Sequence, residues 1–507
     1  MEAFDFIVVG SGTAGCVLAS RLSENAAATV LLLEAGGEEM PKPVADPTVW
    51  PTLQGTSADW ADTSVPQAST GAVVPWPRGR GPGGSSAING LVFVRGHRSS
   101  YDAWAANGAQ GWNFEELLPY LKRTEDTQGR DPAIRGIGGP LQVGPAASPH
   151  PVSEAAISAA TDIGIPHVPD VNSGLEEGYG WADLNIVDGR RQSAADAYLR
   201  PVLDRPNLTM VTSALAQRVV IDGGRATGVE YSIAGRLYTA VCQGEVVLAA
   251  GTVGSPQLMM LSGIGPESHL RDVGISVVGN LPGVGANLHD HPRSTVVYDA
   301  ARPIPPGVNS HAETIGLVRS DPALPSPDIQ LQVLEIPYFA PALPPELSAP
   351  GQAFSVAFCV ATPQSRGTIR LTGSSPDSPL RLDPNYYDDP HDVEVMAAAL
   401  RFARALGRSA ALAPWRGAEV LPGPAVHEDD PRSVRDYLYK SLRTYSHQVG
   451  TCRIGTDRMA VVDAGLRVHG IDGLRVADAS VMPSIVSANP NATVYGIAER
   501  AADLILH

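Results

Sequence analysis

Three glycines near the amino terminus have a spacing that is typical of phosphate binding. Gly10, Gly12 and Gly15 form a Gly-x-Gly-x-x-Gly motif, with Thr13 and Ala14 inside it. The first glycine of such a motif permits a tight turn, the second lets the backbone approach a pyrophosphate, and the third lets helix and strand pack closely. A helix that starts here offers free N–H groups and a partial positive charge to phosphates.

The residues around this motif have the order strand, turn, helix, strand and acid. An apolar run over 4–9 precedes the glycines, helical spacing follows them, and a second apolar run over 30–33 ends in Glu34 and Ala35. Glu34 is positioned to accept hydrogen bonds from an adenosine ribose. The motif therefore predicts a Rossmann-type nucleotide site, and by itself it does not separate FAD from NAD.

A second glycine cluster lies about seventy residues later, over 79–89. Gly83, Gly84 and Ser85 are consecutive small residues that can lie flat against a planar ring or a phosphate, and Asn89 can bond to a ring edge or to phosphates. The same residues also suit a loop that merely needs positive φ angles. Taken alone, the cluster leaves both interpretations open.

The apolar patterns predict the elements that must position these loops. We expect helices over 104–125, 153–164, 193–204, 250–263, 391–407 and 491–506. We expect strands over 208–211, 216–221, 226–231, 235–241, 245–249, 328–334, 354–360 and 474–477. Alternating patterns within 296–375 are typical of a second, antiparallel sheet.

The predicted fold class is α/β, with a Rossmann-like nucleotide-binding domain that is discontinuous in sequence and a substrate domain of antiparallel sheet and helices inserted into it. We assign residues 1–150, 205–295 and 446–507 to the nucleotide-binding domain. Residues 151–204 and 296–445 are assigned to the substrate domain. A length of 507 residues agrees with two domains.

Five blocks of sequence, in order, resemble the glucose-methanol-choline (GMC) oxidoreductase family along nearly the whole chain. They are residues 79–104, 251–265, 281–291, 365–387 and 447–493. The resemblance implies FAD as the cofactor and the oxidation of an alcohol to an aldehyde or ketone. One branch of the family attaches its flavin through a histidine at the position of Ile88, so the resemblance implies noncovalent FAD here.

The resemblance also implies the catalytic residues. Alcohol oxidation needs a base for the hydroxyl proton, a role that suits histidine, and a flavin that takes a hydride. The match gives the base role to His447 and the hydrogen bond to the alcohol oxygen to Asn489, with Asn491 as the near competitor. Tyr445 and Ser446 would line the substrate pocket.

Further cofactor contacts follow from the resemblance. Ala216 would present its backbone to adenine, Asp478 and Ala479 would meet the pyrophosphate or ribityl region, and Thr493 would lie near the pyrimidine edge of the flavin. The remaining implied cofactor residues are Arg80, Gly90, Leu91, Val92, Pro490 and Asn491. No group of aromatic residues that could cage a quaternary ammonium ion is evident, which weakens a choline-type substrate.

Composition narrows the partners and the setting. A net charge of −16 argues against nucleic acid and against an anionic membrane surface. The sequence shows no signal-peptide pattern and no apolar run of about 18 residues, so we expect a cytoplasmic protein without a transmembrane segment. The expected partners are a small alcohol and either O₂ or a quinone as electron acceptor, with the protein a monomer or homodimer.

Cysteine and histidine spacing gives no metal prediction. The four cysteines are far apart and form no CxxC pair, and we expect Cys16 and Cys242 to be buried free thiols. His289 and His291 flank Asp290, but no third ligand accompanies them at metal-site spacing, so we expect no metal.

Two other functions remain open at this point. A non-redox flavoprotein lyase of the hydroxynitrile lyase type would use the same fold and a histidine base. An NAD(P)-dependent dehydrogenase would use the amino-terminal motif alone.

Overall fold

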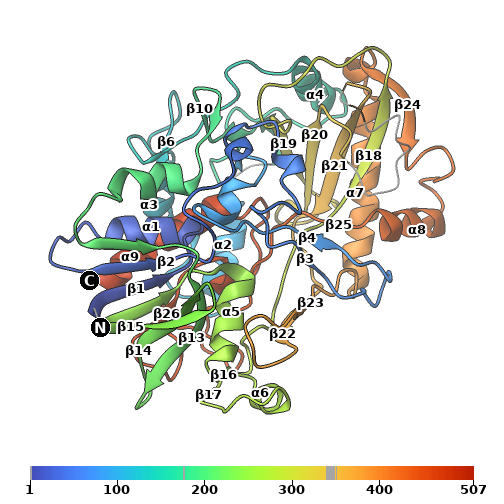
Figure 1. Ribbon diagram of the computed structural model, residues 1–507. Coiled ribbons are helices and arrows are strands. Elements are labelled where there is room, and N and C mark those ends of the chain that lie inside the picture. Colours follow the sequence, from blue (N-terminus) through green and yellow to red (C-terminus); the bar gives the residue numbers. More distant parts are fainter. Residues whose placement is uncertain (1–2, 175–176, 339–348, 350) are drawn as a thin grey trace.

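Parallel strands place the predicted nucleotide turns at one edge of a sheet (Figure 1). The computed structural model describes residues 3–174, 177–338, 349 and 351–507. The parallel strands lie in the order β12 (Leu208–Val211), β2 (Val30–Leu33), β1 (Ala3–Val9), β15 (Arg236–Leu248) and β26 (Leu474–Val476). Residues 7–9, 30–33 and 246–248 in the middle of this sheet are buried Val, Leu and Ile, as expected where strands are covered on both faces.

The first sheet continues as an antiparallel meander. β13 (Leu215–Asp222) pairs with β14 (Arg225–Ile233), and β14 pairs with the first half of β15. Helices α1 (Thr13–Leu22), α3 (Phe114–Thr124) and α9 (Asn491–Leu506) pack together beside this sheet, and α5 (Gly251–Leu261) packs against β13 (Figure 1). The carboxyl-terminal helix thus contacts the first helix of the chain.

The second sheet is antiparallel and lies beside the first (Figure 1). Its strands, in spatial order, are β24 (Arg416–Leu421), β18 (Pro292–Ala300), β21 (Ala353–Val360), β20 (Ile329–Leu334), β19 (Thr314–Val318) and β8 (Gly178–Trp181), with β25 (Arg443–Thr444) also paired to β18. Helix α7 (Pro390–Arg408) packs across β18, β20 and β21, and α4 (Pro151–Asp162) and α8 (Pro431–Ser441) flank it.

Short elements connect the two sheets. The remaining helices are α2 (Arg98–Ala106) and α6 (Glu267–Asp272). The two-stranded pairs are β3 (Asp62–Thr63) with β4 (Pro75–Trp76), β5 (Val92–Phe93) with β9 (Asp183–Leu184), β6 (Glu125–Asp126) with β7 (Leu141–Gln142), β10 (Ile186–Val187) with β11 (Arg190–Arg191), β16 (Ile264–Gly265) with β17 (Gly279–Asn280), and β22 (Thr368–Leu371) with β23 (Leu380–Asp383).

The predicted fold class is confirmed, and four predicted elements are wrong. The helix expected over 104–125 is two helices, α2 and α3, because Gly108 (φ +99°) and Gly111 (φ +85°) turn the chain between them. The strands expected over 235–241 and 245–249 are one strand, β15. The strand continues through Gly244 because the carbonyl oxygen of Asp5 on β1 lies where a side chain at this position would stand, and glycine has none. The helix expected over 193–204 is a π turn followed by a 3₁₀ turn at Pro201.

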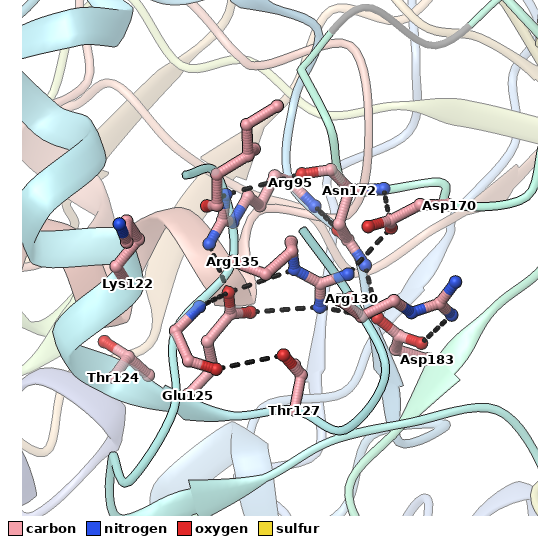
Figure 2. Close-up of polar contacts among 12 residues, drawn as sticks. Arg95, Lys122, Thr124, Glu125, Thr127, Arg130, Arg135, Asp170, Asn172 and Asp183 are labelled. Atoms are coloured by element: carbon pink, nitrogen blue, oxygen red, sulfur yellow. Dashed lines mark hydrogen bonds and ion pairs between the residues drawn. The ribbon is translucent and has the colours of Figure 1, made fainter. Parts of the chain in front are cut away.

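A buried network of charges fastens the loops beyond the second glycine cluster (Figure 2). Arg95 pairs with Glu125, and both side chains are fully buried. Arg135 bonds to the same Glu125 at 3.0 Å and to Asp183 on β9 at 2.6 Å. Since β9 pairs with β5, which begins at Val92 shortly after the cluster, this network anchors the strand that follows the cluster. Removing one partner from such a network strongly destabilises the folded protein, because it leaves a buried charge without compensation.

None of the helices in the described part of the chain combines the length and the hydropathy that a membrane span requires. The four cysteines are free thiols and buried, which confirms the prediction for Cys16 and Cys242.

Candidate active site

A cavity of about 620 Å³ lies where the two sheets meet, within the range typical of small-molecule sites. One side is formed by residues at the carboxyl ends of β1, β2, β15 and β26, the edge at which parallel α/β sheets bind ligands. The other side is formed by residues of β18, β20 and β25 in the second sheet.

Most of the predicted site residues line this cavity. They are Gly10, Gly12, Thr13, Ala14, Glu34, Ala35, Gly84, Ser85, Asn89, Gly90, Val92, Ala216, Tyr445, Ser446, His447, Asp478, Ala479, Asn489, Pro490 and Asn491. These positions are separated by up to several hundred residues in the chain, and the fold brings them to one place.

The two glycine clusters are in direct contact with each other. The N–H of Gly83 donates to the carbonyl of Ser11 at 2.8 Å. A Cβ on Gly84 would stand 2.7 Å from the Cα of Gly12, and one on Gly15 would stand 1.7 Å from the carbonyl oxygen of Gly10. A Cβ on Gly12 would meet only the Cα of Gly84, at 4.0 Å, so Gly12 faces open space on the cavity.

Glu34 ties the two clusters together. One carboxylate oxygen accepts from the backbone N–H and the hydroxyl of Ser11, at 2.9 and 2.7 Å. The other oxygen accepts from the N–H groups of Gly36 and Gly81, at 2.7 and 3.1 Å. These four donors fill the usual capacity of a carboxylate, so a ribose hydroxyl at Glu34 would share an oxygen with them.

The amino termini of α1 and α9 open onto the cavity without a side-chain cap, as does that of α5. The N-cap residues of α1 and α9 are Gly12 and Pro490, and neither makes a side-chain capping bond. Thr13 in the first turn of α1 donates to Oδ1 of Asn491 in the first turn of α9, at 2.9 Å. Helices α3, α4, α7 and α8, by contrast, are capped by their own N-cap side chains. Adjacent uncapped amino termini suit a diphosphate.

Five predicted cofactor residues do not line the cavity. Gly15, Gly83 and Leu91 shape the surrounding turns, and Leu91 has a positive φ of 61°. Arg80 is exposed and its guanidinium lies over the ring of Trp60. Thr493 is buried behind the lining, with its hydroxyl 2.8 Å from that of Tyr101.

His447 lies on the cavity wall and is only 7% exposed. Its ring stacks on Tyr445, with centroids 4.4 Å apart, and its Nδ1 lies 2.9 Å from Nδ1 of His291. Burial lowers the pKa of His447 well below the usual value, and the neighbouring His291, when protonated, and the charge of Arg293 lower it further. The imidazole is therefore neutral at physiological pH.

The hydrogen bonds of His291 assign the proton on His447. Nε2 of His291 lies 3.0 Å from the carbonyl of Ala361, which can only accept, so this Nε2 carries hydrogen. Burial lowers the pKa of His291 to about 4, so the ring is neutral and its Nδ1 accepts. His447 must then donate from its own Nδ1. Its Nε2 is left as a bare acceptor with no partner among the described residues.

Asp290 holds the two histidine segments together. Its Oδ1 accepts from the backbone N–H of His291 at 2.8 Å and from that of His447 at 2.9 Å. Its Oδ2 accepts from the hydroxyls of Tyr386 and Thr444. Burial raises the pKa of Asp290 to about 6. The carboxylate therefore positions the backbone on which His447 stands.

The amide of Asn489 is oriented by the second sheet. Its Oδ1 accepts from Nε2 of Gln330 on β20 at 3.2 Å, which leaves its Nδ2 hydrogens without a partner among the described residues. Asn491 has its Oδ1 engaged with Thr13 instead. Asn489 is thus the asparagine on the second-sheet side of the cavity, and Asn491 belongs to the glycine-loop side.

Sequence reasoning missed three residues of this cavity wall and its support: His291, Asp290 and Arg293. In the sequence, the His-Asp-His block appears as a possible metal site and as the end of a family block, without a role toward His447, whereas the structure uses His291 as a partner of His447. The described residues contain no cluster of three potential metal ligands. A pair of histidines hydrogen-bonded across 156 positions leaves no local signal in the sequence.

Comparison of the sequence and the structure with known proteins identifies the family. Sequence models of the two halves of the GMC oxidoreductases match residues 4–293 and 363–498. The chain belongs to the GMC oxidoreductase family. Mouse mitochondrial choline dehydrogenase is 37% identical over 99% of this chain and 89% of its own length. Pyridoxine 4-oxidase from Mesorbium loti, a solved structure, has a TM-score of 0.94, 37% identity, and coverage of 99% and 98%.

A formate oxidase structure from Aspergillus oryzae, reported for FAD modification, has a TM-score of 0.90 at 26% identity, with coverage of 99% and 98%. These findings confirm the predicted family and the class of FAD-dependent oxidoreductase acting on a CH–OH donor. The match extends far beyond the amino-terminal motif, which argues against an NAD(P)-dependent dehydrogenase that uses this motif alone.

Proposed function

We propose that this GMC oxidoreductase oxidises a primary or secondary alcohol with His447 as the base and Asn489 as the hydrogen-bond donor to the alcohol oxygen. The observation that carries the proposal is the bare Nε2 of His447, fixed by the bond from its Nδ1 to His291. A neutral imidazole with one oriented, unprotonated nitrogen on a cavity wall is suited to accept a proton.

The two glycine clusters and the first turns of α1 and α9 form a cofactor cradle that suits FAD in an extended pose. Gly10, Gly12 and Ala216 would hold the adenosine diphosphate end beside the first turns of α1 and α9. Gly84, Asn89 and the residues at Gly90 and Val92 would hold the flavin end. When bound, FAD supplies the acceptor for the hydride that leaves the α-carbon of the alcohol.

The protein's own residues carry the proton and orient the oxygen. The alcohol O–H would donate to Nε2 of His447, and the N–H of Asn489 would bond the same oxygen. As the C–H bond breaks, the proton passes to Nε2 and the oxygen becomes the carbonyl oxygen of the aldehyde or ketone. Placing one oxygen between two fixed groups accelerates the reaction by positioning.

Noncovalent attachment is part of the proposal. Ile88 lies on the cavity in the second cluster, and its alkyl side chain offers no nitrogen or sulfur for a bond to the flavin. Release of all the FAD into the supernatant after acid denaturation would support this. Yellow colour that stays with the precipitated protein would contradict it.

Four further predictions rest on the sequence alone. They are the boundaries of the five domain segments, the electron acceptor (O₂ or a quinone), the monomer or homodimer state, and a cytoplasmic location. Residues 292–295, at the end of a segment assigned to FAD binding, belong to β18 of the second sheet.

An anaerobic screen of aryl, aliphatic, amino and sugar alcohols tests the proposed activity. An alcohol substrate should bleach the oxidised flavin and yield one carbonyl product per flavin reduced. A flavin that stays oxidised while the protein splits a cyanohydrin would instead support the lyase alternative. Admitting air after bleaching then separates an oxidase from a dehydrogenase.

A further inference from the structure

Arg293 places a buried positive charge on the wall of the cavity. It lies on β18 and is only 6% exposed. Its guanidinium lies over the rings of Tyr338 and Tyr445, at 4.3 and 4.8 Å from their centroids. Tyr445 is also the ring on which His447 stacks. A single aromatic side chain therefore contacts both the guanidinium and the proposed base.

This charge has no counter-ion among the described residues. No carboxylate forms an ion pair with Arg293, and its Nε has no hydrogen-bond partner. An arginine stays protonated even when buried, and a buried, unpaired charge is costly. The described part of the chain does not offset that cost with an acidic side chain of its own.

The surroundings of Arg293 add further donors. Arg443 on β25 is the direct antiparallel partner of Arg293, and it too lines the cavity. Like charges directly opposite each other on paired strands are destabilising. Gln332 on β20 also lines the cavity, and because its Oε1 accepts from Tyr445, its buried Nε2 is left without a partner. This wall therefore combines two cations with an unpaired amide donor.

We propose that Arg293, with Arg443 and Gln332, binds a negatively charged group of the substrate, and that the substrate is therefore an alcohol bearing a carboxylate or an equivalent anion. The inference rests on the proposed alcohol oxidation at His447. The planar fork of a guanidinium suits bidentate binding of a carboxylate.

The same geometry disfavours a quaternary ammonium substrate. Cations of that kind are bound on the faces of aromatic rings. Here the faces of Tyr338 and Tyr445 already carry the guanidinium of Arg293. A second cation would find those faces occupied and would be repelled by the positive charges of Arg293 and Arg443.

Anion binding would also act on the base. The charge of Arg293 contributes to the low pKa of His447, after burial and His291. A carboxylate at Arg293 would oppose that field and make Nε2 of His447 more basic. The acid limb of flavin reduction should therefore lie at higher pH with an anionic alcohol than with a neutral alcohol of the same shape.

Three alcohols of matched shape test the charge preference in the holoenzyme. They are 4-(hydroxymethyl)benzoate, its methyl ester, and the analogue with a trimethylammoniomethyl group in place of the carboxylate. Anaerobic stopped flow gives the rate and apparent Kd of flavin reduction for each. The wild type should favour the carboxylate over the ester by about tenfold or more in rate over Kd, with the cation poorest.

Arg293→Met should lose about 30-fold or more with the carboxylate and less than about threefold with the ester. Arg293→Lys, which keeps the charge without the fork, should retain a reduced preference for the carboxylate. Arg435→Met, an exposed arginine on α8, is the matched control and should behave as wild type. Binding of 4-methylbenzoate, which has no hydroxyl, should weaken in Arg293→Met by calorimetry.

Bleaching by the ester, dependent on His447, would support alcohol oxidation whatever the charge preference, so the two proposals can fail separately. A wild type that prefers the ester or the cation would overturn the inference. Equal losses for all three alcohols in Arg293→Met, at wild-type flavin content, would also overturn it. So would a Lys variant that favours the ester.

Discussion

Nδ1 of His291 lies 2.9 Å from Nδ1 of His447, and the opposite nitrogen of His291 bonds to the carbonyl of Ala361. The series of hydrogen bonds from the carbonyl of Ala361 through His291 to His447 allows only one arrangement of protons when both rings are neutral. The result is an unprotonated Nε2 on His447. A hydrogen bond to His291, which lies 156 positions from His447 in the sequence, thus decides which nitrogen of His447 can act as the base.

Replacing His291 tests this relay. His291→Leu removes the acceptor for the Nδ1 hydrogen of His447, so its ring can take the other tautomer, and the flavin-reduction rate should fall roughly 10²-fold. His291→Asn, whose side-chain carbonyl can still accept, should recover part of that loss. Both variants should keep wild-type FAD content and substrate Kd. Equal rates in the Leu and Asn variants would contradict a role for the acceptor.

Replacing Asn489 tests the donor to the alcohol oxygen. Asn489→Ala removes an N–H that would stabilise the developing negative charge, and kcat should fall roughly 10²–10³-fold with little change in Kd. Asn491→Ala is the matched variant. Because Asn491 is bonded to Thr13 beside the glycine loop, its loss should weaken FAD binding and leave the chemistry of the loaded enzyme nearly intact. The reverse pattern would exchange the two roles.

Two glycine variants separate the cofactor cradle from the fold. A Cβ on Gly12 meets no atom closer than 4.0 Å, so Gly12→Ala should fold with wild-type thermal stability as apoprotein but bind FAD at least tenfold more weakly. A Cβ on Gly15 would stand 1.7 Å from the carbonyl of Gly10, so Gly15→Ala should destabilise the apoprotein itself, by about 3 kcal/mol or more. Calorimetric melting with and without FAD measures both effects. Unchanged FAD affinity in Gly12→Ala would contradict the cradle.

The buried histidines predict how stability depends on pH. Burial lowers the pKa of His291 to about 4, and it lowers the pKa values of His289 and His447 well below 6.5. Below pH 6.5 the unfolded chain binds protons that these native rings do not. The free energy of unfolding should therefore be highest above pH 6.5 and fall as the pH drops from 6.5 toward 4, by up to about 3 kcal/mol for His291 alone.

Asp290 acts in the opposite sense over part of that range. Burial raises its pKa to about 6, so the native state gains a proton before the unfolded chain does, and this contribution grows as the pH falls from about 6 to 3.8. Three histidines outweigh one carboxyl group, so the net effect is a loss. Urea unfolding at pH 7.5 and 5 should show it, and His291→Asn should make the pH dependence shallower. An identical pH dependence in that variant would exclude His291 as a contributor.

Much of the cofactor side of this molecule could be predicted from local sequence. The glycine spacing, the flanking strands and the acid at Glu34 occupy one continuous stretch, and each has a physical reason that is legible in the residues. The structure adds a different duty for Glu34, whose carboxylate joins the two glycine clusters through Ser11 and Gly81. That contact depends on how two loops meet, which no spacing along the chain encodes.

The substrate side was harder to predict. Arg293 is one of many arginines in the sequence, and only the pairing of β18 with β25 and the approach of Tyr338 reveal that it is buried without an acidic partner among the described residues. Likewise, Gly108 and Gly111 interrupt a stretch with otherwise helical spacing, while Gly244 lies inside a continuous strand. The same residue type ends one element and permits another, according to its neighbours in space.

The most direct test of the account is the rate of anaerobic flavin reduction in His447→Gln, measured by stopped flow with a substrate of the wild-type enzyme. The variant should bind FAD as the wild type does and should reduce it at least about 10²-fold more slowly, because no unprotonated nitrogen receives the alcohol proton. Flavin reduction in the variant at a rate close to wild type would contradict the assignment of His447 as the base.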